Sequence, residues 1–224
     1  MKRGMGIGEQ KQAGILLRKL LTEKRLGRLV QEQGKSKTPI IWEKIMESDG
    51  NTTFISQKTL AVRRFHSKYG LTDWKHSELR KWLNTWFIQE AFSTIEQSLL
   101  HPILLDDSRL SDKVSLLNFE NAKRMGKHLE TKDIEIISVP NEPKSLAYGN
   151  TYMSVYGMDA ASRITCNNAW WLRTNALDDL QSAMVVYYHG AIHKRGYKKH
   201  VASCGVRPII RVSSSGSFFT EEAI

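Results

Sequence analysis

Hydrophobic residues near the start of the chain recur at intervals of three and four, which is the period of an α-helix. The stripe lies within residues 9–33 and consists of Leu16, Leu17, Leu20, Leu21, Leu26, Leu29 and Val30, with Lys and Arg between them. Gly27 weakens the pattern in its middle, and Gly34 is a suitable residue to end a helix. We therefore predict one amphipathic helix over residues 9–33.

Three shorter helices are expected further along the chain. The first has Leu79, Trp82, Leu83 and Trp86 at i, i+3, i+4 and i+7, which predicts a helix with one buried face. The second begins at the capping box Ser93-Thr94-Ile95-Glu96 and ends at His101-Pro102. The third is capped by Asn118 and is predicted to run to about Leu129.

Several segments carry the signals of β-strands. Ile40–Met46 and Thr52–Gln57 flank the turn sequence Ser48-Asp49-Gly50-Asn51, which predicts a hairpin. The C-terminal third alternates like an antiparallel sheet over Ala169–Arg173, Ser182–His189 and Val206–Val212. Pro208 lacks a backbone N–H and indicates an edge, a bulge or a strand end. The fold class is therefore predicted as α+β.

The pattern divides the chain into three parts. Residues 1–37 are predicted to hold the helix and a linker, residues 38–212 a folded domain, and residues 213–224 a loosely held tail. The linker is the polar stretch Lys-Ser-Lys-Thr-Pro at residues 35–39. We expect the main domain to fold without residues 1–37.

Charge is concentrated in the first part of the chain. Residues 1–40 hold ten Lys and Arg against three Glu, so most of the net charge of +10 lies there. The expected contacts to an electrostatic partner are Arg18, Lys19, Lys24, Arg25 and Arg28. Three coverings of the apolar stripe remain open: its own domain or a second copy of the chain, a protein partner, and a nucleic acid or an anionic membrane surface.

Composition limits the class of protein. Hydrophobic residues make up 41% of the chain and six are tryptophan, which indicates a folded globular protein. Polar residues interrupt the N-terminus, and no apolar run approaches the length of a membrane span, so we expect neither a signal peptide nor a transmembrane helix. The expected location is the cytoplasm, or a virion if the protein is encoded by a phage.

Two motifs stand out in the C-terminal third, namely Trp170-Trp171-Leu172-Arg173 and Gly205-Val206-Arg207-Pro208. Because neighbouring side chains of a strand point to opposite faces, Trp170 and Trp171 cannot share one environment. We assign Trp82, Trp170, Arg173 and Arg207 structural roles and leave Trp171 as a candidate for the surface. Upstream stand three further blocks: residues 74–84 from Trp74 to Asn84, residues 91–96 from Ala91 to Glu96, and residues 112–120 from Asp112 to Glu120.

In order and spacing, these blocks resemble an uncharacterised bacterial and phage domain family with the motifs W-x-x-S-x-L-R-x-W-L-N, A-F-S-x-x-E, D-x-V-x-L-L-S-x-x-E, W-W-L-R and G-V-R-P. The resemblance covers about residues 38–212, and Asn118 stands where the family usually has Ser. It implies the C-type-lectin-like fold in the variant of formylglycine-generating enzymes, and it leaves the activity open. In lectin-like folds, residues on the last sheet and its loops commonly contact the ligand.

The segment between the Trp170–Arg173 motif and the Gly205–Pro208 motif has the composition of a binding surface. Residues 187–200 contain three tyrosines, three histidines and four cations. Tyr and Arg supply contact energy at low entropic cost, and a hairpin tip through Gly190–Gly196 would present several of them together. The expected contacts are Tyr187, Tyr188, His189, Arg195 and Tyr197, together with Trp171. The alternative is an ordinary solvated hairpin.

Signals of catalysis are weak. His189, His193 and His200 lack acidic or Cys partners at the spacing of metal ligands, so we expect no metal and no cofactor. Cys166 and Cys204 are too few for a disulfide framework and are expected to be reduced thiols. No nucleophile elbow, P-loop or dinucleotide motif occurs in the sequence.

These observations favour a non-catalytic recognition protein of phage or bacterial mobile-element origin. It would bind a protein or another macromolecule through the C-terminal sheet and hairpin. Residues 9–33 would tether the protein or join copies into a homo-oligomer. Two alternatives stay open: a nucleic-acid-associated protein that uses its basic N-terminal segment, and a cysteine-dependent oxidoreductase-like enzyme that uses Cys166 and Cys204.

Overall fold

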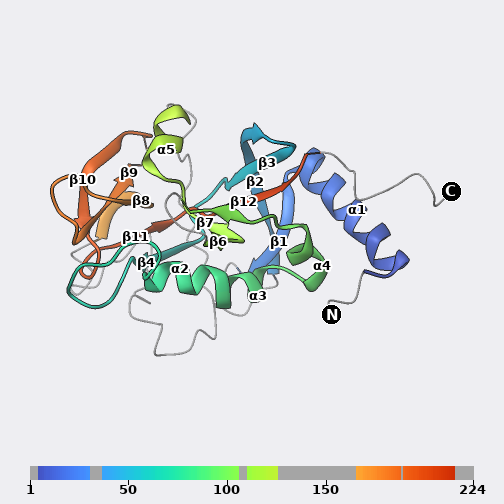
Figure 1. The fold of residues 1–224 in the computed structure, drawn as a ribbon, viewed down its shortest axis with the longest axis horizontal. Coiled ribbons are helices and arrows are strands. Elements are labelled where there is room, and N and C mark those ends of the chain that lie inside the picture. Colours follow the sequence, from blue (N-terminus) through green and yellow to red (C-terminus); the bar gives the residue numbers. More distant parts are fainter. Residues whose placement is uncertain (1–4, 31–36, 106–109, 126–164, 188, 215–224) are drawn as a thin grey trace.

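The computed structural model in Figure 1 describes residues 5–30, 37–105, 110–125, 165–187 and 189–214. It is a mixed fold of short helices and twisted, largely antiparallel sheets. The C-terminal end of the helix expected near Leu129 lies outside the described residues, as do all but the first two residues of the C-terminal tail.

The first sheet has five strands in the order β1-β2-β3-β12-β7. Their bounds are Arg25–Val30 for β1, Lys37–Ser48 for β2, Asn51–Ser56 for β3, Ile209–Ser213 for β12 and Val114–Ser115 for β7. The predicted hairpin is confirmed, because β2 and β3 pair antiparallel. Its turn residues Asp49 and Gly50 have φ of 51° and 68°, so both central positions are left-handed as a tight hairpin turn requires.

The second sheet also has five strands, in the order β10-β9-β8-β11-β4. Their bounds are Ile192–Lys198 for β10, Ser182–Val186 for β9, Thr165–Asn175 for β8, Ser203–Val206 for β11 and Ala61–Arg64 for β4. Three of the four pairings are antiparallel, and β8 with β11 is parallel. A further two-stranded sheet joins β5 (Ile103–Leu104) to β6 (Ser111–Asp112).

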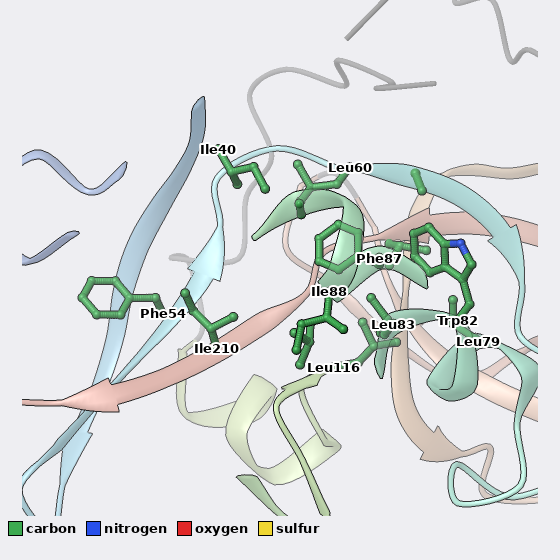
Figure 2. Packing of buried hydrophobic residues seen from close by; sticks show 14 of the residues in the cluster. Ile40, Phe54, Leu60, Leu79, Trp82, Leu83, Phe87, Ile88, Leu116 and Ile210 are labelled. Carbon is green, nitrogen blue, oxygen red and sulfur yellow. The ribbon is translucent and has the colours of Figure 1, made fainter. Parts of the chain in front are cut away.

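The helix predicted from Leu79, Trp82, Leu83 and Trp86 is present. It consists of three consecutive segments: α2 (Glu78–Trp82), a π-helical turn η1 (Leu83–Phe87) and α3 (Ile88–Ala91). Ser77 caps it by accepting a hydrogen bond of 3.1 Å from Arg80 N. Leu79, Trp82 and Leu83 are buried, whereas Trp86 is half-buried and stacks on Trp82. Figure 2 shows how Leu83 and Ile88 of this helix join the same core as Leu116 and Ile210.

Both capped helices are present. Ser93 and Glu96 form the predicted capping box of α4 (Thr94–Leu99). Asn118 Oδ1 accepts a hydrogen bond of 2.9 Å from Asn121 N at the start of α5 (Phe119–Met125). Each cap satisfies a backbone N–H that the first turn of a helix cannot pair internally.

The predicted helix over residues 9–33 is wrong in its second half. Helix α1 spans Ile7–Glu23 and ends at Lys24, whose φ of 59° is left-handed, and the chain continues as β1. Gly27 has φ of 72° within this strand, and a Cβ there would lie 2.8 Å from a ring carbon of Phe92. A left-handed, tightly packed position suits glycine alone, so Gly27 belongs to a bent strand rather than to a weak point in a helix.

The hydrophobic stripe is covered by the chain itself. Leu17 and Leu20 of α1, and Leu26 and Leu29 of β1, are buried in the same core as the helix at residues 78–91. Trp42 Nε1 of β2 donates a hydrogen bond of 2.8 Å to Leu26 O. Helix α1 packs on α4 and β1, so the leucines of the N-terminal segment are part of one continuous hydrophobic core.

The expected single strand over Val206–Val212 is also wrong. Strand β11 ends at Val206 in the second sheet, and β12 begins at Ile209 in the first. Arg207 and Pro208 carry the chain between the sheets, and Pro208 O accepts a hydrogen bond of 2.9 Å from Ser56 N. The prediction that Pro208 marks a strand end is confirmed.

Candidate functional site

The sequence motifs meet in the scaffold rather than at an open site. Asp112, at the start of the third block, is 1% exposed. Its carboxylate accepts hydrogen bonds from Trp74 Nε1 at 2.8 Å, Arg80 Nε at 2.6 Å and Ser115 Oγ at 3.2 Å. Burial of a carboxylate is tolerated when it is paired and hydrogen-bonded in this way. Asp112 therefore joins the first motif block to the third.

Asn84 makes a second connection between the same blocks. Its Nδ2 donates to Val114 O at 2.8 Å, and its Oδ1 accepts from Lys113 N at 3.0 Å and from Val114 N at 3.2 Å. An amide side chain can replace a neighbouring strand by offering both a donor and an acceptor. Asn84 thus extends the edge of the first sheet at β7 with a side chain.

Arg207 lies inside the protein where the chain crosses between the sheets. Its side chain is fully buried, and its Nε donates to Ser56 O at 3.0 Å. The guanidinium lies 5.1 Å from the ring centre of Trp170 and 3.9 Å from Glu43 Oε2. Burial lowers the pKa of Arg207 to about 10, with Glu43 opposing the shift. Arg173, on β8, is buried as well.

The prediction that Trp171 lies on the binding surface is wrong, because Trp171 belongs to the core. It is fully buried, its Nε1 donates to Arg63 O at 2.8 Å, and its ring meets Phe65 edge-on at 5.7 Å. Trp170 is buried in a second cluster with Leu172 and Met184. The two tryptophans do occupy different faces of the sheet, as alternation requires, but both faces are covered.

The β9–β10 hairpin turns earlier than expected. Tyr187 N donates to Ala191 O and Gly190 N donates to Tyr187 O, both at 2.9 Å, so the chain has already turned back at Ala191. Gly190 has φ of 84° in this turn. Gly196 lies within β10, where the pairing register shifts, and a Cβ there would be 1.7 Å from Ala183 O. Gly196 therefore allows a bulged strand to approach β9.

Four rings form one connected row on this hairpin, and we call Tyr187, His189, His193 and Tyr197 the ring row. His193 lies between the two tyrosines, 5.6 Å from Tyr187 and 5.7 Å from Tyr197. The ring centre of His189 is also 5.6 Å from that of Tyr187. His189 is exposed and the other three are half-buried. Tyr188 lies outside the described residues.

The two tyrosines of the ring row contact each other through their hydroxyl groups. The hydroxyls of Tyr187 and Tyr197 are 3.3 Å apart. Burial, and then this contact with Tyr187, raise the pKa of Tyr197 to about 12. The row therefore offers aromatic faces, two hydroxyls and imidazole nitrogens, without a carboxylate within it. Such a surface suits recognition through stacking and hydrogen bonds.

Cations border the ring row. Lys194, Arg195 and Lys198 are exposed. Arg195 Nε lies 3.7 Å from Asp178 Oδ2, and both side chains remain mostly exposed at 84% and 74%. Lys198 Nζ is 2.8 Å from Asp179 Oδ2, and hydrogen bonds from Lys198 and Ser182 hold the pKa of Asp179 at about 2. Arg195 is therefore an expected contact that stays open to a partner.

The sequence places Lys199 among the four cations of the expected binding segment, but its side chain is buried and holds neighbouring loops together. It is 2% exposed. Its Nζ donates to Asn175 Oδ1 and Leu180 O at 2.7 Å each, and also to Thr72 O. Burial lowers the pKa of Lys199 to about 8. The Lys199 ammonium thus connects the turn after β10 to loops 65–77 and 176–181. No local sequence pattern predicts this connection.

The basic N-terminal residues are spread over two elements. Arg18, Arg25 and Arg28 are exposed, whereas Lys19 and Lys24 are half-buried. Lys24 Nζ donates to Leu21 O and lies 5.6 Å from the ring centre of Phe54. Lys24 is therefore engaged by its own fold, and the arginines are the more accessible members of the set.

The expected state of the cysteines is corrected. Cys204 is buried and disulfide-bonded, not a reduced thiol. The parallel register pairs Ser203 with Thr165, so the backbones of β11 and β8 bring the two cysteine positions alongside each other. The side chain of Cys166 lies outside the described residues.

Two searches of the described residues bear on other classes of site. Among these residues, no three His, Cys, Asp or Glu side chains group as they would around a metal ion. In the same part of the chain, no helix is both long and apolar enough to cross a membrane.

Comparison with known proteins identifies a family without an assigned activity. The model of a domain of unknown function, DUF6273, matches residues 50–214. No curated protein and no solved structure matches the chain significantly.

Proposed function

Because the chain belongs to the DUF6273 family of domains of unknown function, we propose a function from the geometry of the site: the protein is a non-catalytic recognition protein. It binds a protein or another macromolecule through the β9–β10 hairpin, with the ring row and Arg195 as the contacts. We further propose that the two sheets form a C-type-lectin-like domain in which this hairpin takes the ligand-contacting place of the last sheet.

The observation that supports the proposal is the connected, partly open ring row. Tyr187, His193 and Tyr197 are half-buried and pack on one another at 5.6–5.7 Å, so each ring is held in place by its neighbour. Rigid aromatic groups lose little entropy when a partner covers them. By contrast, Trp170 and Trp171 of the adjacent β8 are fully covered and have no surface left to offer.

The surrounding contacts favour a preformed site. Lys199 fixes the loops behind the hairpin, and Gly196 lets β10 approach β9 closely enough to align the rings. A preformed surface binds with a smaller ordering cost than a mobile one. The exposed guanidinium of Arg195 adds a planar donor beside the rings.

The test begins with the intact protein, screened against displayed protein fragments and immobilised glycans. The affinity of each ligand selected by the wild type is then measured for His189→Ala/Arg195→Ala and for Tyr197→Phe. His189 and Arg195 are exposed, so their loss should leave the unfolding transition unchanged. We expect at least roughly tenfold weaker binding for the double variant, since central contacts of an interface dominate its affinity.

Lys68→Ala/Lys81→Ala is the matched control, because both side chains are exposed and lie outside the hairpin. Its affinities should equal those of the wild type. If every selected ligand binds the hairpin variants and the wild type equally well, or if no ligand is selected, the hairpin is not a recognition surface.

A further inference from the structure

Helix α1 has an outward face that the core does not use. Its inward positions Ala13, Leu17 and Leu20 are buried. Facing away from them, at intervals of three and four residues, stand Ile7, Lys11, Ile15 and Arg18, and all four are exposed. We call these four residues the α1 outer face.

The α1 outer face carries positive charge from Lys11 and Arg18. In the part of the chain that the structure describes, no carboxylate pairs with Lys11 or Arg18. The two acidic residues of α1 are used elsewhere: Glu9 accepts a hydrogen bond of 3.0 Å from Gly6 N at the start of the helix, and Glu23 lies 4.0 Å from Arg25. The half-buried Lys19 borders the same side of the helix.

Two large apolar side chains lie among these cations. Ile7 is 80% exposed and Ile15 is 61% exposed. A face that served solubility alone would carry polar residues at these positions. Isoleucine and basic residues mixed on one exposed helical face are typical of helices that lie in the boundary between water and lipid, where the apolar groups enter the acyl region and the cations meet anionic headgroups.

We propose that the α1 outer face docks the protein on an anionic lipid surface, with the helix axis parallel to that surface. A second copy of the chain, a nucleic acid and a lipid surface would each meet this face differently. A second copy would place Lys11 and Arg18 against the same cations, which repel. A nucleic acid would neutralise the cations but leave Ile7 and Ile15 in water. An anionic lipid surface uses both kinds of residue.

The position of α1 gives the docking a consequence. Helix α1 lies at one end of the long axis of the molecule, and strands β9 and β10 lie at the other (Figure 1). A protein held to a surface by the α1 outer face would therefore present its hairpin away from that surface. The lipid contact does not depend on the proposed recognition by the ring row, since the two use different residues.

The experiment is vesicle co-sedimentation with the full chain at low and at high salt. The vesicles contain phosphatidylcholine alone or phosphatidylcholine mixed with phosphatidylglycerol. We expect binding to the anionic vesicles only, and weaker binding at high salt because exposed charges are screened. Lys11→Glu/Arg18→Glu and, separately, Ile7→Ser/Ile15→Ser should each weaken binding by about tenfold or more.

Lys68→Glu/Lys81→Glu makes the same change in net charge at exposed positions on other elements and should bind like wild type. All variants should keep the wild-type unfolding transition, because every changed side chain is exposed. Failure to bind anionic vesicles at low salt, or an equal loss in the control variant, overturns the proposal. The proposal is also overturned if Ile7→Ser/Ile15→Ser binds vesicles like wild type and double-stranded DNA displaces both the variant and the wild type from the vesicles.

Discussion

The indole Nε1 of Trp74 donates a hydrogen bond of 2.8 Å to Oδ2 of Asp112, a carboxylate that is 1% exposed. The opposite oxygen of Asp112 accepts from Arg80 Nε at 2.6 Å. Residues from two separate motif blocks thus share one buried charge. The shared carboxylate indicates that these two motif blocks serve the scaffold. The hairpin lies outside the motifs and remains the candidate for recognition.

Replacing Asp112 by Ala should destabilise the protein by about 3–5 kcal/mol, because it leaves the Arg80 guanidinium and the Trp74 N–H without their buried acceptor. Urea unfolding at neutral pH measures the change. Asp73→Ala is the control, since Asp73 pairs with His76 at the exposed surface and should cost about 0–1 kcal/mol. Equal losses for the two variants would contradict a structural role for the buried carboxylate.

Lys199 should make stability depend on pH in the alkaline range. Burial lowers its pKa from 10.5 to about 8 in the folded protein. Between these values the unfolded chain binds the proton that the folded chain has lost, so the free energy of unfolding should rise with pH, by about 1–3 kcal/mol. Below pH 8 both states are protonated and this contribution should not change.

The rise is measured by urea unfolding from pH 7.5 to 10, in wild type and in Lys199→Met. The variant cannot titrate at this position, so the difference between the two proteins isolates Lys199 from other groups. A wild-type curve that runs parallel to the variant curve across this range would refute the assignment.

Gly196→Ala should destabilise the hairpin more than a left-handed backbone alone explains. Its φ is 54°, and a Cβ there would lie 1.7 Å from Ala183 O, so β10 must move away from β9. Gly50→Ala is the matched control, because Gly50 has φ of 68° with no atom within 4 Å of the added Cβ. The control should cost about 1 kcal/mol and Gly196→Ala at least about 2 kcal/mol more. Thermal unfolding distinguishes the two, and equal costs would mean that β10 adjusts freely.

Leu20→Ala in α1 should destabilise the whole protein by about 2–5 kcal/mol, because Leu20 is fully buried in the main core. This changes our expectation for the N-terminal segment: removal of residues 1–37 should abolish the cooperative transition rather than leave it intact. Ile15→Ala on the exposed side of the same helix should change stability by less than about 0.5 kcal/mol. An unchanged transition in Leu20→Ala would restore the view of a separable segment.

Local signals in the sequence were sufficient for several elements. The turn at Asp49 and Gly50, the capping box at Ser93 and Glu96, and the face of Leu79, Trp82 and Leu83 are each decided by neighbours within a few residues. Such features could be predicted because the backbone geometry, the cap and the burial all favour the same structure.

Other features depend on residues far apart in the chain and could not be predicted. Leu26 and Leu29 fit either a helix or a strand, and the choice was made by pairing with β2 and by the contact of Gly27 with Phe92. The break at Arg207 follows from the crossing between sheets, and the burial of Lys199 follows from oxygens of Thr72, Asn175 and Leu180. The ring row was predicted in part, since His193 was not among the expected contacts; it joins the row because it pairs with Val185, two residues before Tyr187.

Hydrogen–deuterium exchange of the intact protein, with and without a selected ligand, determines whether the hairpin is the recognition surface. Exchange reports which backbone segments become protected when a partner covers them. Recognition by the hairpin predicts new protection over Tyr187–Tyr197, and His189→Ala/Arg195→Ala should lose this protection at the same ligand concentration. Protection confined to residues 7–30, or an unchanged hairpin in a saturated complex, would contradict it.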